Sequence, residues 1–131
     1  MDIFQVSTNS RNEFVDITGK VRKIIQDAEV QNGIVILYTP HTTAGITINE
    51  NADPSVPADI TMKLSDVIDR DSRFRHAEGN SDSHIKSSLV GCSEQVMLEN
   101  GRLALGTWQG IFFCEFDGPR TRKVYVQIIG K

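Results

Sequence analysis

The sequence predicts an α+β fold that is mostly β, built as an antiparallel sheet system or a β-sandwich with two to three helices. Two observations predict this class. The first is that extended segments, about seven in number, outnumber the two to three helical patterns. The second is that consecutive extended segments are joined by short turns, as antiparallel neighbours are. The 131 residues fit a single domain, 1–131, that is long enough to bury a core.

The first quarter of the chain predicts a strand, a turn and a helix. Residues 3–8 alternate between apolar and polar side chains, and 14–17 continue extended after a turn. Thr18 has the character of a helix N-cap, and Asn32-Gly33 of a helix end. The apolar stripe between them consists of Val21, Ile24, Ile25 and Ala28.

The second quarter predicts two buried strands and a second helix. Residues 34–38 are β-branched and continuously apolar, and 44–49 resume an extended pattern. Asp53-Pro54 has the form of an N-cap followed by a first-turn proline, which predicts a helix to about Asp69. The expected buried stripe of this helix is Ile60, Leu64, Val67 and Ile68.

The second half begins with a polar stretch and ends in strands. Residues 70–83 carry little apolar material, and a connection of this length inside a domain is often functional. A short helix is expected over 84–91. Asn100-Gly101 predicts a hairpin turn between flanking strands. The apolar run 106–116 predicts a strand at the centre of a sheet, and 123–129 a closing strand.

Composition excludes several classes of protein. Charged residues make up 24% of the chain and hydrophobic residues 39%, ordinary values for a soluble protein. A net charge of −3 gives no general attraction to nucleic acid or an anionic membrane, and 7% aromatic residues argue against a base-stacking surface. The chain has no apolar run of membrane length and no secretory pattern at its start. We expect neither a nucleic-acid nor a membrane partner.

The two cysteines, Cys92 and Cys114, lack metal-ligand spacing. We expect both to be buried thiols in a reducing environment, which predicts a cytoplasmic protein.

The three histidines, His41, His76 and His84, are the first candidates for chemistry. Each one alone is more often structural than catalytic. Together they can form a zinc site or a set of phosphate-binding and proton-transfer groups. Their spacing matches no metal motif, so only the fold can bring them together.

Two polar clusters follow strands. The first, Asn49–Asp53, is either a helix-capping loop or a set of oxygen ligands for a hard cation or polar ligand. The second, Asp117–Arg120 with Arg122 and Lys123, is either a plain turn or a site in which Arg120 binds phosphate or carboxylate. The glycine-rich loops that bind nucleotides are absent from the sequence.

Three stretches resemble one known family. The stretches 41–54, 84–91 and 106–120 are similar, in order, to the signatures of the YjbQ family, also named the secondary thiamine-phosphate synthase family. The resemblance implies an antiparallel two-sheet, jelly-roll-like sandwich with flanking helices. It also implies a homotrimer with polar pockets between or near subunits, and thiamine-phosphate synthase activity.

The same resemblance implies a set of site residues. One position departs from the expected pattern, since Ser55 stands where many relatives are expected to carry an acid, and this removes one carboxylate near Glu50. The implied polar site consists of His41, Asn49, Glu50, His76, His84, Asp117 and Arg120.

The first functional hypothesis is a transferase that joins hydroxymethylpyrimidine diphosphate to thiazole phosphate and releases diphosphate. Arg120, Lys86 and protonated histidines would hold the diphosphate. A Mg²⁺ ion on Glu50 or Asp117 would neutralise it. Trp108 would shelter the pyrimidine ring, although a core or interface anchor is its more common role.

Two alternatives belong to other classes. The first is a zinc-dependent hydrolase with His41, His76 and His84 as ligands and Glu50 or Asp117 as general base. The second is a non-catalytic trimeric protein that binds a small phosphorylated metabolite.

Overall fold

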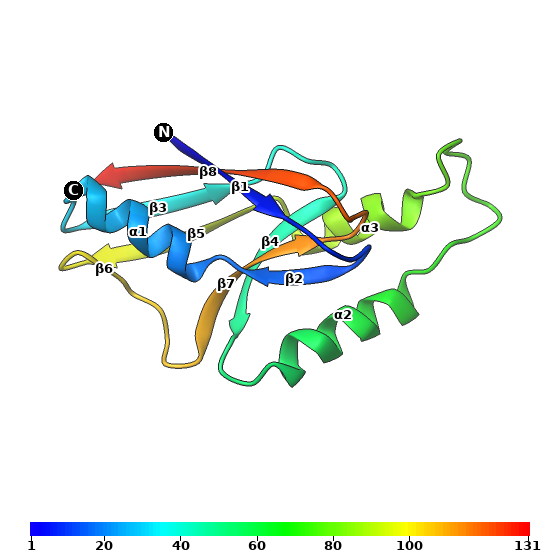
Figure 1. Cartoon of the computed structure of the whole chain (residues 1–131), viewed down its shortest axis with the longest axis horizontal. Coiled ribbons are helices and arrows are strands. Elements are labelled where there is room, and N and C mark those ends of the chain that lie inside the picture. Colours follow the sequence, from blue (N-terminus) through cyan, green and yellow to red (C-terminus); the bar gives the residue numbers. More distant parts are fainter.

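The computed structural model describes the whole chain, Met1–Lys131, as eight strands and three helices (Figure 1). The helices are α1 (Thr18–Ala28), α2 (Ser55–Val67) and α3 (Ser81–Val90). The strands are β1 (Asp2–Ser7), β2 (Glu13–Asp16), β3 (Gly33–Tyr38), β4 (Ala44–Glu50), β5 (Ser93–Glu99), β6 (Arg102–Leu103), β7 (Gln109–Glu115) and β8 (Thr121–Gly130).

The strands form two antiparallel sheets. The five-stranded sheet has the order β1-β8-β3-β5-β6, and the three-stranded sheet has the order β2-β7-β4. The prediction of a mostly β, α+β fold with two antiparallel sheets is therefore confirmed. The apolar strand β7 lies at the centre of its sheet, as predicted, and pairs with β2 on one side and β4 on the other.

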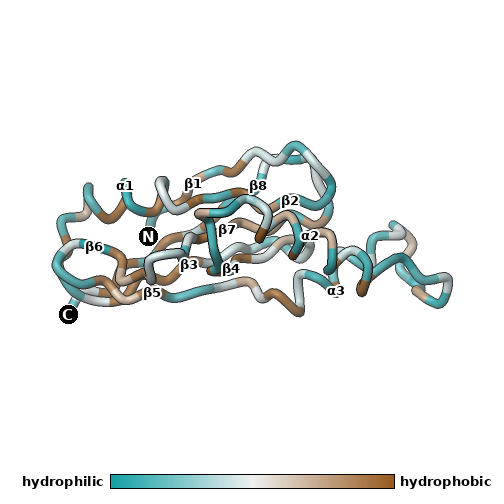
Figure 2. The backbone as a smooth tube through the Cα atoms, turned by 90° about the horizontal axis from the view of Figure 1, so that it is seen from below, coloured by the Kyte–Doolittle hydropathy of each residue, from teal (hydrophilic) through white to brown (hydrophobic).

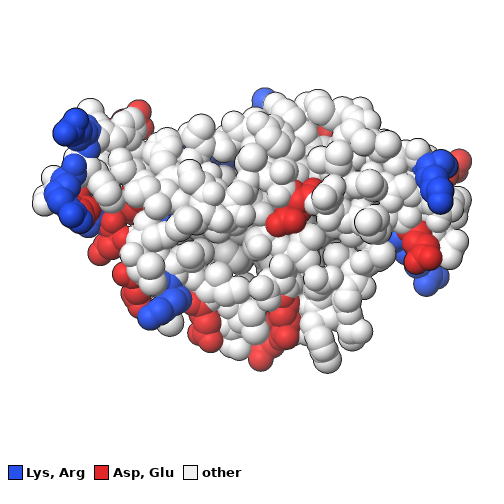
Figure 3. Space-filling model, turned by 180° about the vertical axis from the view of Figure 1, so that it is seen from behind, with Lys and Arg blue, Asp and Glu red and all other residues white.

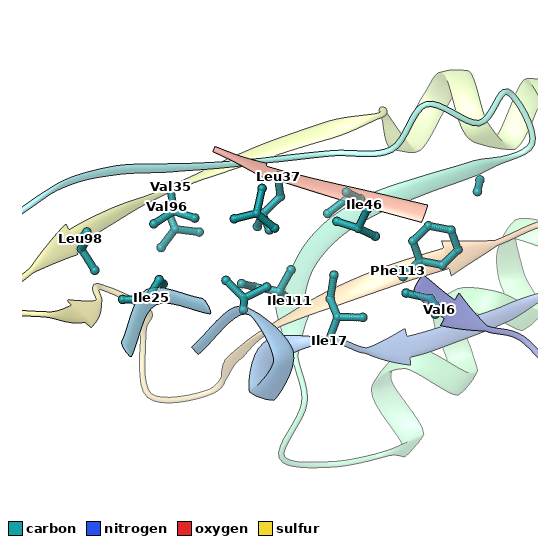
Figure 4. Close-up of a cluster of buried hydrophobic side chains, with 14 residues drawn as sticks. Val6, Ile17, Ile25, Val35, Leu37, Ile46, Val96, Leu98, Ile111 and Phe113 are labelled. Carbon is teal, nitrogen blue, oxygen red and sulfur yellow. The ribbon is translucent and has the colours of Figure 1, made fainter. Parts of the chain in front are cut away.

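The hydrophobic core lies between the two sheets. Val35 and Leu37 on β3 face Ile111 and Phe113 on β7, and these side chains point toward one another in Figure 4. Helix α1 adds Val21 and Ile25 to the same cluster. Burial of this apolar surface supplies most of the favourable free energy of folding.

The opposite face of the five-stranded sheet carries no helix. Ile34 on β3 stands beside Met97 on β5 and Ile129 on β8, and all three point away from the core. Figure 2 shows β3 and β5 on the side of the molecule away from α1. That side, seen in Figure 3, has a broad middle area with few charged side chains.

Helix α1 differs from the prediction at both ends. It stops at Ala28, four residues before Asn32, because Glu29 turns the chain into the left-handed conformation. Thr18 is its first residue and not a cap. The Thr18 hydroxyl instead donates to Asp16 Oδ1 at 2.6 Å and accepts the N–H of Ile111 at 2.8 Å, which ties α1 to β7.

Helix α2 begins one residue later than predicted, at Ser55, whose N–H donates to the Asp53 carboxylate at 2.9 Å. The predicted buried stripe was wrong in part. No residue of α2 is fully buried, and Val67 is 69% exposed because the helix ends there and leaves its last turn beyond the sheet.

Helix α3 ends at Val90, with Gly91 as its C-cap, one residue before the predicted end, and it starts three residues earlier than predicted, at Ser81. The hairpin of β5 and β6 is confirmed, with Asn100 and Gly101 at φ values of 52° and 75°. Helices α2 and α3 lie at the same end of the molecule and are joined by the irregular segment 68–80, which extends away from the sheets (Figure 1).

The cysteine prediction was right for one residue only. Cys114 is buried in β7, and burial raises the pKa of its thiol, whereas Cys92 is exposed before β5. Neither cysteine forms a disulfide. No helix of the structure is long and apolar enough to span a membrane.

Candidate functional site

A polar pocket of about 400 Å³ opens where four segments of the chain meet. These segments are the β3–β4 loop, the 68–80 segment, the start of α3 and the β7–β8 turn with the first residues of β8. Apart from Pro40, every side chain that lines the pocket is polar or charged. Its lining residues are Pro40, His41, Thr42, Thr43, His76, Glu78, Asn80, His84, Asp117, Arg120 and Arg122.

His41 is held by the end of a strand pair. Strand β3 stops at Tyr38, opposite Tyr125, so Lys123 on β8, which pairs with Gln5 of β1, has no partner on β3. His41 Nε2 accepts the N–H of Lys123 at 2.9 Å. Burial, and after it the charge of Arg122, lower the pKa of His41. The imidazole is thus neutral, with its proton on Nδ1, because an acceptor nitrogen carries no proton.

His76 and His84 form a pair on the other side of the pocket. Their rings meet edge to face with centroids 5.4 Å apart. His84 comes from the first turn of α3 and His76 from the preceding loop, so the loop is folded back against the helix. The nearest carboxylate is that of Glu78, 4.0 Å from His76 Nε2. His76 is 43% exposed and His84 is half-buried, and both line the pocket.

Asp117 and Arg120 form the wall supplied by the β7–β8 turn. Arg120 donates to the carboxylate of Asp117 at 3.2 Å and to its carbonyl at 2.9 Å. Asn80, a residue that sequence reasoning missed, donates to the same carboxylate at 2.7 Å. Its own Oδ1 is the one buried side-chain oxygen or nitrogen without a hydrogen-bond partner. A water or a bound donor group would satisfy it.

Glu115 and Arg122 form a buried ion pair, and Arg122 lines the pocket. The sequence placed Arg122 in the polar cluster that begins at Asp117, but it did not predict the pairing with Glu115. Burial alone would raise the pKa of Glu115, but hydrogen bonds from Arg122, the Asp117 N–H and Thr8 outweigh it and lower that pKa. The signal for Arg122 was its spacing, because it alternates with Val124 and Val126 on the buried face of β8.

Three other predicted site residues lie far from this pocket. Asn49 and Glu50 stand at the end of β4, whereas His41 precedes its start, and the rise of a strand separates the two ends by roughly 20 Å. Trp108 precedes β7 at that same distant end and is 63% exposed. Within one chain, the fold does not bring these residues to the histidines.

Lys86 is likewise outside the pocket. It lies on the buried face of α3, where its amine donates to Asn12 Oδ1 at 3.1 Å and stands 4.0 Å from the Asp82 carboxylate. Arg11 binds the same carboxylate with both terminal nitrogens, at 3.0 and 3.1 Å. Burial lowers the pKa of Lys86, and Asp82 opposes that shift. These contacts fix α3 to the β1–β2 loop.

The pocket does not contain a preformed metal site. No group of three His, Cys, Asp or Glu side chains is arranged to hold an ion. His41 uses the lone pair of Nε2 to accept the Lys123 N–H, and its Nδ1 carries the proton. The three histidines therefore line one pocket but do not fit a three-histidine metal centre in this arrangement.

The fold and site together define a class: a small two-sheet α+β domain with a polar pocket of histidines and arginines at one end. A family model described as "UPF0047 protein YjbQ-like" matches residues 2–131. The chain belongs to this YjbQ-like family, as its motifs predicted.

Relatives of the chain are similar over nearly their full lengths. A UPF0047 protein of Methanocaldococcus jannaschii is 59% identical over 127 residues, which cover 97% of this chain and 92% of that protein. The UPF0047 protein YugU of Bacillus subtilis is 52% identical, with 96% of each chain covered. A solved structure of a YjbQ/UPF0047 protein from Clostridium acetobutylicum is 51% identical, with a TM-score of 0.96 over 98% of this chain and 100% of that one.

Proposed function

We propose that the chain is a transferase with thiamine-phosphate synthase activity, which couples hydroxymethylpyrimidine diphosphate to thiazole phosphate. The observation that carries the proposal is the convergence of His41, His76, His84 and Arg120 on one polar pocket. Cationic and hydrogen-bond-donating side chains in such a number suit a multiply charged phosphate ligand.

The proposed reaction exchanges one bond for another. The bond between the pyrimidine methylene carbon and the diphosphate oxygen breaks, and the electron pair leaves on diphosphate. The lone pair of the thiazole ring nitrogen forms the new carbon–nitrogen bond. Charge develops on the departing oxygen, so Arg120 would stabilise the transition state there and the His76–His84 pair would supply protons to diphosphate.

The test is thiamine phosphate formation by purified protein. We expect His84→Ala and Arg120→Ala to lower the rate by about a hundredfold each, since each removes a group that faces the leaving diphosphate. Glu99→Gln, on the distant β5–β6 hairpin, serves as the control with unchanged rate. Equal rates in all four proteins would assign the activity to a contaminant or to another site.

A zinc-dependent hydrolase is the second candidate, favoured by the three histidines in one pocket. It requires His41 to give up its bond with Lys123. Metal analysis of protein purified without an affinity tag tests it. Stoichiometric zinc, lost in His84→Ala, would support a hydrolase; metal-free protein that gains no hydrolysis on adding Zn²⁺ would exclude it. Because the transferase hypothesis includes Mg²⁺ and the hydrolase hypothesis Zn²⁺, the thiamine phosphate and hydrolysis assays are both run with and without each cation.

A binding protein without catalysis is the third candidate. It shares the pocket and the ligand chemistry of the transferase, a small phosphorylated metabolite, and differs only in the absence of turnover. Saturable binding with no product over many hours would favour it.

We further propose that the protein is a cytoplasmic homotrimer, as the family resemblance implies. The uncovered apolar sheet face, with Ile34, Met97 and Ile129, supports association. In a trimer, Glu50 and Trp108 of one subunit could approach the pocket of another, which one chain alone does not allow. Sedimentation equilibrium gives the mass directly, and a monomer at micromolar concentration would contradict the proposal.

A further inference from the structure

Arg122 is held in position before any ligand binds. Its Nε and one terminal nitrogen, Nη2, donate to the carboxylate of Glu115, and Nη2 also donates to the carbonyl and hydroxyl of Thr43. The side chain is 2% exposed. The other terminal nitrogen, Nη1, makes no hydrogen bond with the protein, although Arg122 lines the pocket. One edge of the guanidinium is thus fixed, and the other is free to bind.

His41 is also held in place, by the backbone of β8. Its Nε2 lone pair accepts the backbone N–H of Lys123, the residue after Arg122. An imidazolium has no lone pair, so this hydrogen bond itself requires a neutral ring with the proton on Nδ1. His41 therefore has one N–H to donate and no free lone pair for a metal or a proton.

We propose that Arg122 and His41 form a preset anion-binding pair, in which His41 is a neutral Nδ1–H donor and neither a metal ligand nor a general base. The inference rests on the proposed function and assigns the residues that bind its diphosphate. The anion that fits is a phosphate or diphosphate oxygen, which accepts from a charged and a neutral donor together. Because both donors are fixed, binding costs little side-chain entropy.

The side chains of the pocket differ in how firmly they are held. Arg120 is half exposed and bound only to Asp117, so it can move with the ligand. His76 is 43% exposed and packs edge to face on His84, so this pair can also move with the ligand. Arg122 and His41 are both held by hydrogen bonds to the protein. This suits them to fix the position of the anion while the more mobile side chains adjust to it.

The first experiment reads the tautomer directly. Two-bond proton–nitrogen correlation spectra of ¹⁵N-histidine-labelled protein distinguish protonated Nδ1 from protonated Nε2. We expect His41 to be protonated on Nδ1 alone, both in free protein and with inorganic diphosphate added. Protonation of Nε2, or of both nitrogens, would overturn the proposal, as would loss of the Nδ1 proton on adding Zn²⁺.

The second experiment compares two variants of His41. Asparagine places its amide nitrogen where Nδ1 lies, and glutamine places its amide near the Nε2 position. We expect His41→Asn to bind inorganic diphosphate within a few-fold of wild type by calorimetry, and His41→Gln to lose about tenfold or more. The reverse order, or equal binding in both, would contradict the assignment.

The third experiment tests Arg122. Arg122→Lys keeps a charge for Glu115 but lacks the free Nη1 nitrogen, so diphosphate affinity should fall by about tenfold or more, with a smaller loss for Arg120→Lys. If Arg122→Lys does not fold, Glu115→Gln/Arg122→Met removes both buried charges and should fold without binding diphosphate. Wild-type affinity in either variant would overturn the proposal.

The outcomes separate the two proposals. Inorganic diphosphate binding that follows the expected order, without thiamine phosphate formation, would leave the anion-binding pair intact and reject the transferase. Thiamine phosphate formation that is unaffected by the His41 and Arg122 variants would support the transferase and reject the anion-binding pair.

Discussion

Glu115 is the residue on which the pocket depends most for its shape. Its carboxylate is fully buried and accepts hydrogen bonds from Arg122, Thr8 and the backbone N–H groups of Phe116 and Asp117. These contacts join β7, β8 and the segment after β1 at one point. The same carboxylate neutralises the guanidinium that we propose for anion binding, so structural and functional roles meet in one ion pair.

Replacing Glu115 should therefore destabilise the whole chain. Glu115→Ala leaves the charge of Arg122 buried without a partner, and we expect a loss of about 3–5 kcal/mol in the free energy of unfolding. Urea unfolding followed by circular dichroism measures it. Glu99→Gln, an exposed residue of the β5–β6 hairpin, is the control and should change stability by less than about 0.5 kcal/mol. A similar small change for Glu115→Ala would show that the pair carries no net stability.

Gly118 is a second residue that shapes the pocket. A Cβ atom at this position would lie 2.4 Å from the carbonyl oxygen of Ser10 and 2.8 Å from Thr8 Oγ1, so the turn between Asp117 and Arg120 would have to move. We expect Gly118→Ala to cost about 1–3 kcal/mol and to weaken diphosphate binding.

The matched control for this substitution is Gly19→Ala. Gly19 lies within α1, where an added Cβ would meet no atom within 4 Å. Alanine should stabilise the helix there by about 0.5–1 kcal/mol, because it loses less backbone entropy than glycine. Thermal unfolding compares the two variants, and a shift in the same direction for both would contradict the steric argument.

At the scale of elements, α3 has an unusual orientation. Its buried face is polar, with Asp82, Ser83, Lys86 and Ser87, whereas Leu89 is 68% exposed. Hydrogen bonds replace apolar packing at this interface: Ser83 donates to the Phe116 carbonyl and Ser87 to the Ala44 carbonyl. Because hydrogen bonds are directional, this interface fixes the rotation of α3 as well as its distance from the sheet. His84 on α3 therefore points into the pocket.

Breaking this interface should release α3 without unfolding the sheets. Asp82→Ala removes the acceptor of two Arg11 hydrogen bonds and leaves Lys86 buried beside no carboxylate. We expect amide hydrogen exchange in 81–90 to accelerate by about tenfold or more, while β3 and β7 keep their protection. Ser88→Ala, on the exposed face of α3, is the control. Unchanged exchange in Asp82→Ala would mean that other contacts hold the helix.

At the scale of the whole molecule, two buried carboxylates and the half-buried His41 set the response to acid. Hydrogen bonds from Arg11 lower the pKa of Asp82, and hydrogen bonds from Arg122 lower that of Glu115 against the effect of burial. Burial lowers the pKa of His41. In each case the unfolded chain takes up a proton more readily than the native state, so acid favours unfolding.

The expected loss of stability occurs in two ranges of pH. His41 contributes a first loss as the pH falls below about 6.5, and Asp82 and Glu115 a second, larger loss below about 4. Urea unfolding at a series of pH values measures both. In His41→Asn the first loss should disappear and the second remain. A free energy of unfolding that does not change down to a pH of about 3 would show that these groups are not coupled to folding.

The sequence by itself determined the family, the fold class and most of the elements. Alternation and β-branching identified the strands, because burial on one or both faces of a sheet leaves a local period that can be read along the chain. The Asn100-Gly101 turn and the central position of β7 followed from the same local chemistry. Element ends, such as Glu29 at α1, were less accessible, because they depend on single backbone angles.

Only the tertiary structure decided which polar residues meet. His41, the 76–84 region and the 115–122 region are joined by strand pairing and by the docking of α3, contacts between residues far apart in the sequence. The same pairing separates Glu50 and Trp108 from the histidines, since a strand carries its two ends apart. Lys86, placed near His84 by sequence, faces the opposite way because residues two positions apart lie on different sides of a helix. Arg122 is held at the pocket by its buried ion pair with Glu115. No local sequence pattern predicts that ion pair, because it forms between two different strands.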